Sequence, residues 1–259
     1  MGILRSLLSE KAYTHYLRIK NSLVSEKIPD DSAEILKQRE LFYAQFAGAG
    51  DLVYDVGANY GNRIIPLLKN GCKVVAIEPQ KKCYTYLEKK FGNTIELVKS
   101  GLGEKEEVRD FYISNSSTIS TFSNEWLDKV KEGRFRYYTW NKTEKVKLTT
   151  LDSLVQQFGL PKFIKIDVEG FEYEVLKGLH HLVEYISVEY NVPENLLKTK
   201  NCIQYLAELN PHACFNYSVG ESMQLKYTEW MSIDDMQSLI QTDEFLATSF
   251  GDIYIKNKL

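Results

Sequence analysis

The sequence predicts an α/β fold, a parallel sheet with helices on both faces. From residue 51 onward, short apolar segments alternate with segments of helical periodicity, which is typical of strand–helix–strand units. Within this region, residues 52–78 (LVYDVGANYGNRIIPLLKNGCKVVAIE) indicate a buried strand that ends at Asp55, a glycine turn, a helix and a second strand that ends at Glu78. The chain has 259 residues, 44% of them hydrophobic, which is enough for an ordinary buried core.

The predicted elements begin with two helices. An amphipathic helix is expected over 3–24, because leucines recur there at helical spacing, and a second helix follows Pro29 and ends near Phe46. Residues 48–50 (GAG) form the hinge into the first strand. The first half of the sheet is then expected to contain strands at 52–56, 73–77 and 95–98 and helices at 61–69 and 80–91.

Residues 104–149 break this alternation. They contain short β-like segments, a Ser/Thr cluster and a helix expected around 124–131, so they indicate an insertion over one end of the sheet. The alternation then resumes, with helices at 151–158, 171–179 and 194–208 and strands at 163–168 and 185–190. The last part is expected to form a hairpin-like pair of strands, within 214–227 and 252–256, around a helix near 233–241.

This organisation predicts an N-terminal helical extension at 1–49 and one domain at 50–259 that includes the insertion. No internal repeat and no low-complexity segment divides the chain further. The leading helices either cover the domain or form a homodimer interface, and the sequence does not distinguish between these two alternatives.

Composition argues against several classes of function. The net charge of −3 provides no positive field for phosphates, which disfavours nucleic acid as a partner. No apolar run approaches the roughly 18 residues that a membrane span needs. The four cysteines are far apart and form no CxxC pair, which argues against a zinc site and favours free thiols in a reducing compartment. We therefore expect a cytoplasmic protein without a membrane span.

The glycine turn at 57–61 (GANYG) is the first candidate site. A dinucleotide fingerprint would require G-x-G-x-x-G at this point, and the turn lacks it. Gly57 and Gly61 allow the backbone to turn tightly and to approach a ligand closely. Asp55 and Glu78 end the two adjoining strands, where ligands bind in open α/β sheets. S-adenosylmethionine fits these groups, because Asp55 could counter its ammonium and Glu78 could accept hydrogen bonds from its ribose diol.

The segment 163–172 (FIKIDVEGFE) is the second candidate site, because Asp167 ends a third buried strand at the same edge of the sheet. If the strand continues, its period of two places Lys165, Asp167 and Glu169 on one face. Ionisable groups are costly at a buried strand end unless they are paired, hydrated or bound to a ligand. Glu189 lies near the end of the next strand and could face Asp167.

These side chains, Lys165, Asp167, Glu169 and Glu189, are the candidate catalytic groups, and several roles stay open for them. Asp167 and Glu189 could hold a divalent cation through oxygen ligands and so acidify a substrate hydroxyl. One of these two acids could instead serve as a general base, or both could only hydrogen-bond the substrate. The simplest alternative is an acidic cap for the helix that begins at Phe171. No residue is assigned as a metal ligand.

The insertion combines a hydroxyl-rich stretch at 116–121 with arginine and aromatic side chains at 134–140 (RFRYYTW). Hydroxyls, guanidiniums and aromatic faces suit a polar ligand with apolar faces, such as a sugar. The alternative is a solvated loop that its aromatic residues anchor to the core.

Five motifs together resemble the FkbM family of methyltransferases. They are DVGANYG, AIEP, TTLDSL, IKIDVEGFEYEVLKGL and FGDIYIK, and the similarity covers roughly residues 50–257. The resemblance implies a class I methyltransferase (Rossmann-like) fold, with a seven-stranded sheet in which one strand is antiparallel. It also implies S-adenosylmethionine as methyl donor and O-methylation of a hydroxyl on a small molecule, sugar or glycan.

Position by position, the resemblance assigns Asp167 and Glu169 to the motif that faces the reaction centre. Glu78 matches the acid that binds the ribose, and residues 100–102 lie where the adenine is usually held. The positions implied at the cofactor are Asp55, Gly57, Asn59, Gly61, Glu78, Ser100, Gly101, Leu102 and Asp167. The chain departs from the family at 62–64 (NRI), where many members carry a small hydroxyl residue.

Three other functions compete with this one. A nicotinamide-dependent oxidoreductase on a related fold is disfavoured by the missing glycine fingerprint, and an absorbance change with NAD(P)H would test it. A nucleic-acid methyltransferase is disfavoured by the acidic net charge and by the lack of an Asn-Pro-Pro-aromatic motif. A non-catalytic scaffold that keeps the cofactor fold is disfavoured by the retained acids, although a fold alone does not prove activity.

Overall fold

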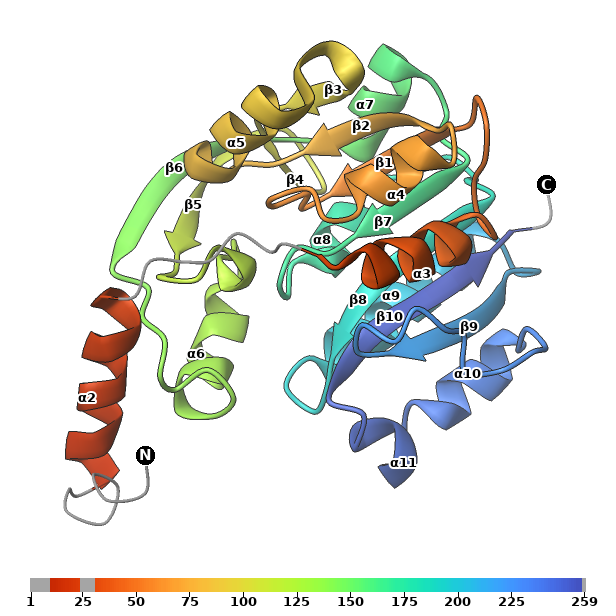
Figure 1. Cartoon of the computed structure of the whole chain (residues 1–259). Coiled ribbons are helices and arrows are strands. Elements are labelled where there is room, and N and C mark those ends of the chain that lie inside the picture. Colours follow the sequence, from red (N-terminus) through yellow and green to blue (C-terminus); the bar gives the residue numbers. More distant parts are fainter. Residues whose placement is uncertain (1–9, 24–30, 258–259) are drawn as a thin grey trace.

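A computed structural model describes residues 10–23 and 31–257 of the chain (Figure 1). Two sheets organise these residues, a central sheet of seven strands and a smaller sheet of three. Helices cover both faces of the central sheet, and the smaller sheet lies beyond the ends of several central strands (Figure 1).

The central sheet follows the order β3-β2-β1-β7-β8-β10-β9. Its strands are β1 (Leu52–Val56), β2 (Lys73–Ile77), β3 (Glu96–Val98), β7 (Phe163–Ile166), β8 (Tyr185–Asn191), β9 (Cys214–Val219) and β10 (Phe250–Lys256). Neighbouring strands pair in parallel except at β10, which runs antiparallel to both β8 and β9. This arrangement confirms the predicted seven-stranded, mostly parallel sheet and its single antiparallel strand.

Buried residues alternate between the two faces of the sheet along its inner strands. Val53 of β1 and Val74 of β2 belong to one hydrophobic cluster, whereas the adjacent Tyr54 and Val75 belong to another. The first face is covered by α3 (Ala33–Tyr43), α4 (Ile64–Lys69) and α5 (Lys81–Phe91). The second face is covered by α7 (Leu151–Phe158), α8 (Glu172–Leu176), α9 (Leu196–Leu209), α10 (Ile233–Leu239) and α11 (Asp243–Leu246). Because both faces are covered, the inner strands are almost entirely apolar until they reach their charged ends.

Some element boundaries differ from the sequence prediction. Helix α4 begins at Ile64 instead of residue 61, because positive φ angles at Asn59 and Gly61 keep the preceding residues in turns. The two-residue strand β4 (Gly101–Leu102), the short α11 and the single-turn η1 (Gly92–Thr94) were not predicted. Elements this short carry too few residues for a period to be recognised.

The insertion folds into the smaller sheet and one helix. β5 (Glu107–Ile113) and β6 (Lys142–Thr149) pair antiparallel, and β4 pairs with β6 in parallel. Between β5 and β6 the chain forms the turn η2 (Ser117–Ile119) and α6 (Asn124–Glu132). Trp126 of α6 is fully buried and packs with the aromatic residues that follow the helix, so the insertion has a small core of its own.

Helix α3 packs directly on the central sheet. Phe42, Tyr43 and Phe46 are each at most 3% exposed. The ring of Phe46 stacks on Tyr254 of β10 at 4.9 Å between centroids and on Phe163 of β7 at 5.3 Å. The second leading helix therefore covers the sheet, which is one of the two alternatives that the sequence left open.

Helix α2 (Glu10–Leu23) lies apart from the central sheet, on the side of the insertion (Figure 1). Arg18 Nε donates a hydrogen bond to the carbonyl of Arg136 at 2.8 Å, and Arg136 forms an ion pair with Glu10 at 3.5 Å. Residues 3–9 of the predicted first helix and the predicted break at Pro29 lie outside the described residues. Dimerisation through the leading helices stays a prediction.

Two further features bear on the predictions from composition. All four cysteines are free thiols, as their spacing indicated. Within residues 10–23 and 31–257, none of the helices has the length and apolar character that crossing a membrane requires.

Phe42→Ala should lower the free energy of unfolding by about 3–5 kcal/mol, because it removes a buried ring that packs on Phe46 and Tyr254. Leu41→Ala is the matched control from the same helix. Its side chain is 61% exposed, so we expect a change below about 0.5 kcal/mol. Urea unfolding followed by circular dichroism measures both variants. Equal effects would contradict the packing of α3 on the sheet.

Candidate functional site

A cavity of about 360 Å³ lies at the carboxyl ends of the central strands. Its wall comes from the turns after β1 and β7, the ends of β2 and β8, and the start of β4. The insertion contributes residues 117–120, Phe122 and 134–135 to the same wall. Ligands of open α/β sheets bind at this edge, so the cavity is the candidate functional site.

Gly57 brings the turn after β1 against the end of β7. Its φ is +82°, and a Cβ at this position would lie 1.9 Å from the carbonyl oxygen of Asp167. Its amide donates to the carbonyl of Ile77 at 3.0 Å, which ties the turn to β2. The turn therefore joins three strands in one wall of the cavity, and only glycine fits at its first position.

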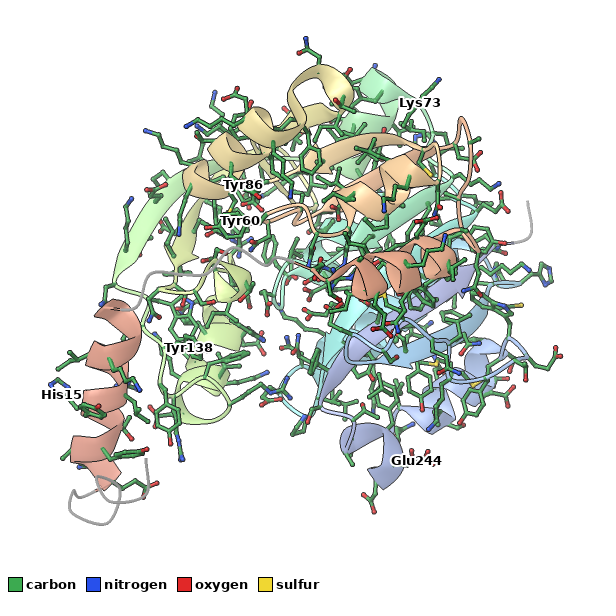
Figure 2. The ribbon with its side chains drawn as sticks, in the orientation of Figure 1. His15, Tyr60, Lys73, Tyr86, Tyr138 and Glu244 are labelled. Atoms are coloured by element: carbon green, nitrogen blue, oxygen red, sulfur yellow. The ribbon has the colours of Figure 1, made fainter. Side chains whose placement is uncertain are left out.

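Gly61 packs against a helix. A Cβ on Gly61 would lie 2.7 Å from Leu87 and 2.8 Å from Phe91, both on α5. Gly61 does not line the cavity, whereas Tyr60 does, and the ring of Tyr60 meets Tyr86 edge-on at 5.2 Å between centroids (Figure 2). Gly61 thus makes its close approach to α5, and the predicted contact of Gly61 with a ligand stays a prediction.

Glu78 directly follows β2 and lines the cavity. Its Oε2 accepts a hydrogen bond from the amide of Asn59 at 2.8 Å, and its Oε1 accepts one from the amide of Gln80 at 2.7 Å. Burial raises the pKa of Glu78 to about 7, although these two amides act in the opposite direction. Because a carboxylate oxygen has two lone pairs, each oxygen can accept one more hydrogen bond. The group therefore fits the two hydroxyls of a ribose.

Asp55 is the last charged residue of β1 and is buried beneath the glycine turn, outside the cavity wall. Its Oδ2 has no hydrogen-bond partner among the residues that the structure describes. Burial raises the pKa of Asp55 to about 6, against the effect of the nearby Arg63 and Lys165 cations. A buried carboxylate oxygen without a partner is costly, and it fits an ammonium group that interacts directly or through a water molecule.

Ser100, Gly101 and Leu102 line the cavity together with two aromatic residues of the insertion. A Cβ on Gly101 would lie 2.5 Å from the ring of Phe122, so glycine permits the close packing of this wall. The rings of Phe111 and Phe122 lie 4.5 Å apart between centroids. An apolar wall of this kind suits a flat heteroaromatic base, which is the group expected there.

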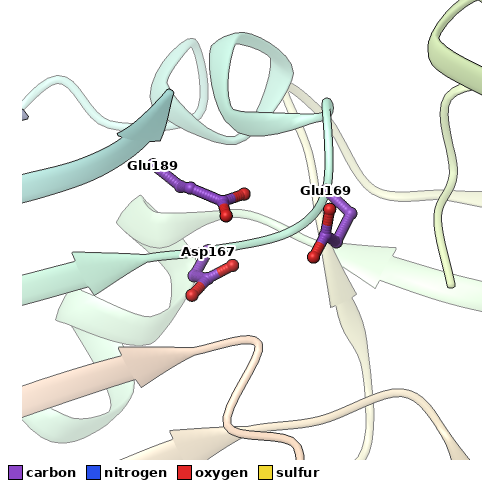
Figure 3. A group of neighbouring side chains, drawn as sticks. All are labelled: Asp167, Glu169 and Glu189. Carbon is purple, nitrogen blue, oxygen red and sulfur yellow. The ribbon is translucent and has the colours of Figure 1, made fainter. Parts of the chain in front are cut away.

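Three carboxylates converge where β7 and β8 end (Figure 3). Oxygen atoms of Asp167, Glu169 and Glu189 all lie within 4.8 Å of one another. Asp167 and Glu189 come from the ends of neighbouring parallel strands, and Glu169 reaches them from the turn after β7 with a φ of +55°. Such a cluster is compatible with a divalent cation, which prefers oxygen ligands, and equally with carboxyl groups that share protons.

Glu172 holds the turn that carries Glu169. Its buried Oε1 accepts hydrogen bonds from the amides of Val168 at 3.1 Å and Gly170 at 3.0 Å. From the insertion, the hydroxyl of Thr121 donates to the carbonyl of Glu169 at 2.7 Å. The left-handed backbone of Glu169 is thus stabilised from both sides, which aims its carboxylate at the cluster.

The three carboxyl groups of the cluster differ in how readily they ionise. Burial alone would raise the pKa of Asp167, but the cations of Lys165 and Arg63 outweigh it and hold that pKa below its ordinary value. Burial and the charge of Asp167 raise the pKa values of Glu169 and Glu189 well above the usual range. Asp167 is therefore the ionised member at neutral pH, whereas Glu169 and Glu189 both hold protons more strongly than ordinary carboxyl groups.

Lys165 lies behind Asp167 and outside the cavity wall. Its side chain is 1% exposed, and its Nζ pairs with Asp167 at 3.3 Å and with Asp252 of β10 at 2.6 Å. Burial lowers the pKa of Lys165, but the two carboxylates more than reverse this effect and keep it a cation. We expected a catalytic group at this position; the structure gives Lys165 access to a ligand only through Asp167.

Arg63 and Glu221 line the cavity, and the sequence analysis did not identify either as a site residue. Arg63 pairs with Asp167 at 3.4 Å and with Glu221 at 2.9 Å. Glu221 also pairs with Arg39 of α3 at 3.5 Å. The one signal in the sequence that could have identified Arg63 as a site residue was the departure from the family pattern at 62–64. Nothing in the chain around Glu221 signals a contact with a residue 158 positions away.

Arg134 fastens the insertion to the end of β8. One guanidinium nitrogen donates to Oδ1 of Asn191 at 3.0 Å, and another donates to the carbonyls of Val192 and Ser249, both at 2.9 Å. The adjacent Phe135 lines the cavity. This part of the insertion is therefore held rigidly next to the acid cluster.

The hydroxyl-rich stretch of the insertion faces the glycine turn and the end of β2. Ser117 donates to Oδ1 of Asn59 at 3.1 Å, and Ser120 donates to Oε1 of Gln80 at 3.2 Å. Trp140 donates its indole N–H to a backbone carbonyl of this stretch at 2.8 Å. The aromatic residues therefore anchor the insertion, and its hydroxyls face the cavity, whereas binding of a polar ligand there stays a prediction.

Comparison with known proteins identifies the family. A family model described as the methyltransferase FkbM domain matches residues 55–242. Solved structures of similar fold include the O-methyltransferase from Bacillus cereus in complex with SAH, at 12% identity and a TM-score of 0.45, covering 97% of this chain and 93% of that one. Another is precorrin-6y C5,15-methyltransferase from Geobacter metallireducens, at 10% identity and a TM-score of 0.44, covering 91% and 94%. A search of curated proteins gave no match.

The family match covers well over half of the chain, and it includes the glycine turn, Glu78 and the acid cluster. The chain therefore belongs to the FkbM family of methyltransferases, and its methyl donor is S-adenosylmethionine.

Proposed function

We propose that the protein methylates a hydroxyl oxygen of a small molecule, sugar or glycan. The observation that carries this proposal is one cavity whose wall contains both Glu78 and the three carboxylates Asp167, Glu169 and Glu189. The first suits a ribose diol, and the others suit a hydroxyl and the proton that it loses. We also propose that residues 50–259 form the catalytic domain and that the insertion at 104–149 covers the acceptor.

At the cofactor, S-adenosylmethionine supplies a methyl group activated by its positively charged sulfur. Glu78 would accept hydrogen bonds from the ribose hydroxyls, and the apolar wall around Leu102 and Phe122 would hold the base. Asp55 counters the ammonium group. The unpartnered Oδ2 of Asp55 supports this assignment, because a positively charged ligand would remove the cost of leaving it buried.

At the acceptor, Lys165 and Arg63 keep Asp167 ionised, and the negative charge of Asp167 raises the basicity of Glu189, which would accept the hydrogen bond of the hydroxyl. Glu189 is the better general base, because a carboxylate with a raised pKa holds a proton more strongly. It would take the proton that the hydroxyl loses as the methyl group passes from sulfur to oxygen, which breaks the sulfur–carbon bond and leaves S-adenosylhomocysteine. Holding the hydroxyl in line with the methyl group supplies much of the remaining rate. A divalent cation held by the three carboxylates is the alternative means of acidifying the hydroxyl.

Isothermal titration with S-adenosylhomocysteine, with and without magnesium, tests the cofactor end. We expect micromolar binding, and Glu78→Ala should weaken it by roughly 10- to 100-fold through loss of charged hydrogen bonds to the ribose. Glu96→Ala, at an exposed position on β3, is the matched control and should bind as the parent protein does. Tighter binding in magnesium would favour the cation alternative, and no binding by a folded sample would reject the cofactor assignment.

Asp167→Asn should lower turnover by roughly 100-fold or more while changing the affinity for S-adenosylhomocysteine by less than about threefold. The variant should fold, because Lys165 keeps Asp252 and Arg63 keeps Glu221 as partners. Turnover is measured as S-adenosylhomocysteine release with an acceptor found in a screen of hydroxylated sugars and small molecules. An equal loss of turnover and affinity, or no loss, would exclude the proposed role.

The rate should rise with pH along an acidic limb set by the proton of Glu189. Burial raises the pKa of this group most, followed by the charges of Asp167 and Glu169. Glu169→Gln removes the negative charge that Glu169 gains as the two coupled groups titrate, so the pKa of Glu189 should fall and the acidic limb should move to lower pH. Glu125→Gln, on the exposed side of α6, should leave the limb in place. A shift of the limb to higher pH in Glu169→Gln is the result that contradicts this assignment.

A further inference from the structure

The charge of the cavity wall poses a recognition problem for the cofactor. S-adenosylmethionine carries an α-carboxylate beside its ammonium, and the described wall contains five carboxylate side chains. They are Glu78, Asp167, Glu169, Glu189 and Glu221. A carboxylate of the ligand needs a cation or donors to offset this repulsion. Among the residues that the structure describes, the wall offers two positively charged side chains, Arg63 and Arg134.

Arg134 is already saturated by protein partners. Its guanidinium donates to Asn191, to the carbonyls of Val192 and Ser249, and to Glu194 at 3.3 Å. These bonds attach the insertion to β8, so withdrawing Arg134 toward a ligand would break several of them at once.

Arg63 keeps unused hydrogen-bonding capacity. Its Nε is buried and has no hydrogen-bond partner within the described part of the chain. One terminal nitrogen donates only to the neighbouring Asn62 at 3.3 Å, and the other donates to Glu221 at 2.9 Å and lies 3.4 Å from Asp167. A guanidinium has five N–H donors in a planar fork that matches a carboxylate. Arg63 therefore has a free edge for such a group.

Arg63 also lies close to the acid expected to counter the ammonium. Its charge is the largest influence that opposes the rise in the pKa of Asp55, so the two groups interact across the start of the turn. An acid and an arginine at the two ends of one turn match the ammonium and carboxylate of one amino acid.

We propose that Arg63 binds the α-carboxylate of S-adenosylmethionine and so determines recognition of the amino-acid end of the cofactor. Glu221 is the partner that yields: its side chain is 49% exposed, and it can keep its pairing with Arg39 when it releases Arg63. The inference rests on the proposed position of the cofactor in this cavity.

The test compares two ligands that differ at one end. S-adenosylhomocysteine contains the α-carboxylate, whereas 5′-methylthioadenosine keeps the adenosine and the sulfur but lacks the amino-acid group. Isothermal titration should show that Arg63→Met weakens S-adenosylhomocysteine by roughly 10- to 100-fold and changes 5′-methylthioadenosine by less than about twofold. Arg63→Lys should recover part of the loss, because it restores the charge but not the fork.

Glu221→Gln is the complementary variant. It removes the competing carboxylate from Arg63, so it should bind S-adenosylhomocysteine several-fold more tightly and 5′-methylthioadenosine unchanged. An equal loss of both ligands in Arg63→Met, or no loss of either, overturns the proposal. Failure of the parent protein to bind either ligand would instead overturn the cofactor site itself, and the two failures are therefore distinguishable.

Discussion

The site depends on one requirement: charged side chains that are buried at the carboxyl edge of the sheet must form ion pairs or hydrogen bonds. Charges removed from water are costly unless each has an opposite charge or hydrogen bonds. Here cations and anions alternate through Asp252, Lys165, Asp167, Arg63, Glu221 and Arg39. Because these residues come from β10, β7, the turn after β1, the loop after β9 and α3, each pair ties a different element to one edge. The ionised state of Asp167 follows from its place inside this series.

A second group of carboxyls at the same edge lacks ion-pair partners of its own among residues 10–23 and 31–257. Glu78 relies on two backbone amides, Asp55 has an unpartnered oxygen, and Glu169 and Glu189 face the charge of Asp167. Burial raises the pKa of each of these four groups. Raised acidic pKa values mean that the ionised forms destabilise the folded protein near neutral pH. Ligands that bring positive charge or hydroxyl donors would relieve this cost. The unfavourable electrostatic energy is therefore concentrated where the proposed cofactor and acceptor bind.

The insertion links the two ends of the cavity mechanically. Its hydroxyl-rich stretch bonds to Asn59 and Gln80 near the proposed ribose site, whereas Thr121 and Arg134 bond to the acid-cluster turn and to the end of β8. A small aromatic core around Trp126 keeps these contacts on one body. The insertion therefore forms part of the cavity wall at both ends.

The sequence by itself determined the inner strands and the acids at their ends. β1 and β2 match the predicted ranges 52–56 and 73–77, and Asp55, Glu78 and Asp167 lie at or directly after strand ends at the predicted edge. These features could be predicted because the burial pattern and the positions of glycines are local properties of the chain. The tertiary structure decided which side chains meet there. Gly61 packs on α5, Lys165 reaches the cavity only through Asp167, and Arg63 acquires Glu221 from 158 positions away. These contacts join residues that are far apart in the sequence and meet only when the strands and loops assemble at one edge of the sheet. The local periodicity of the sequence therefore cannot predict them.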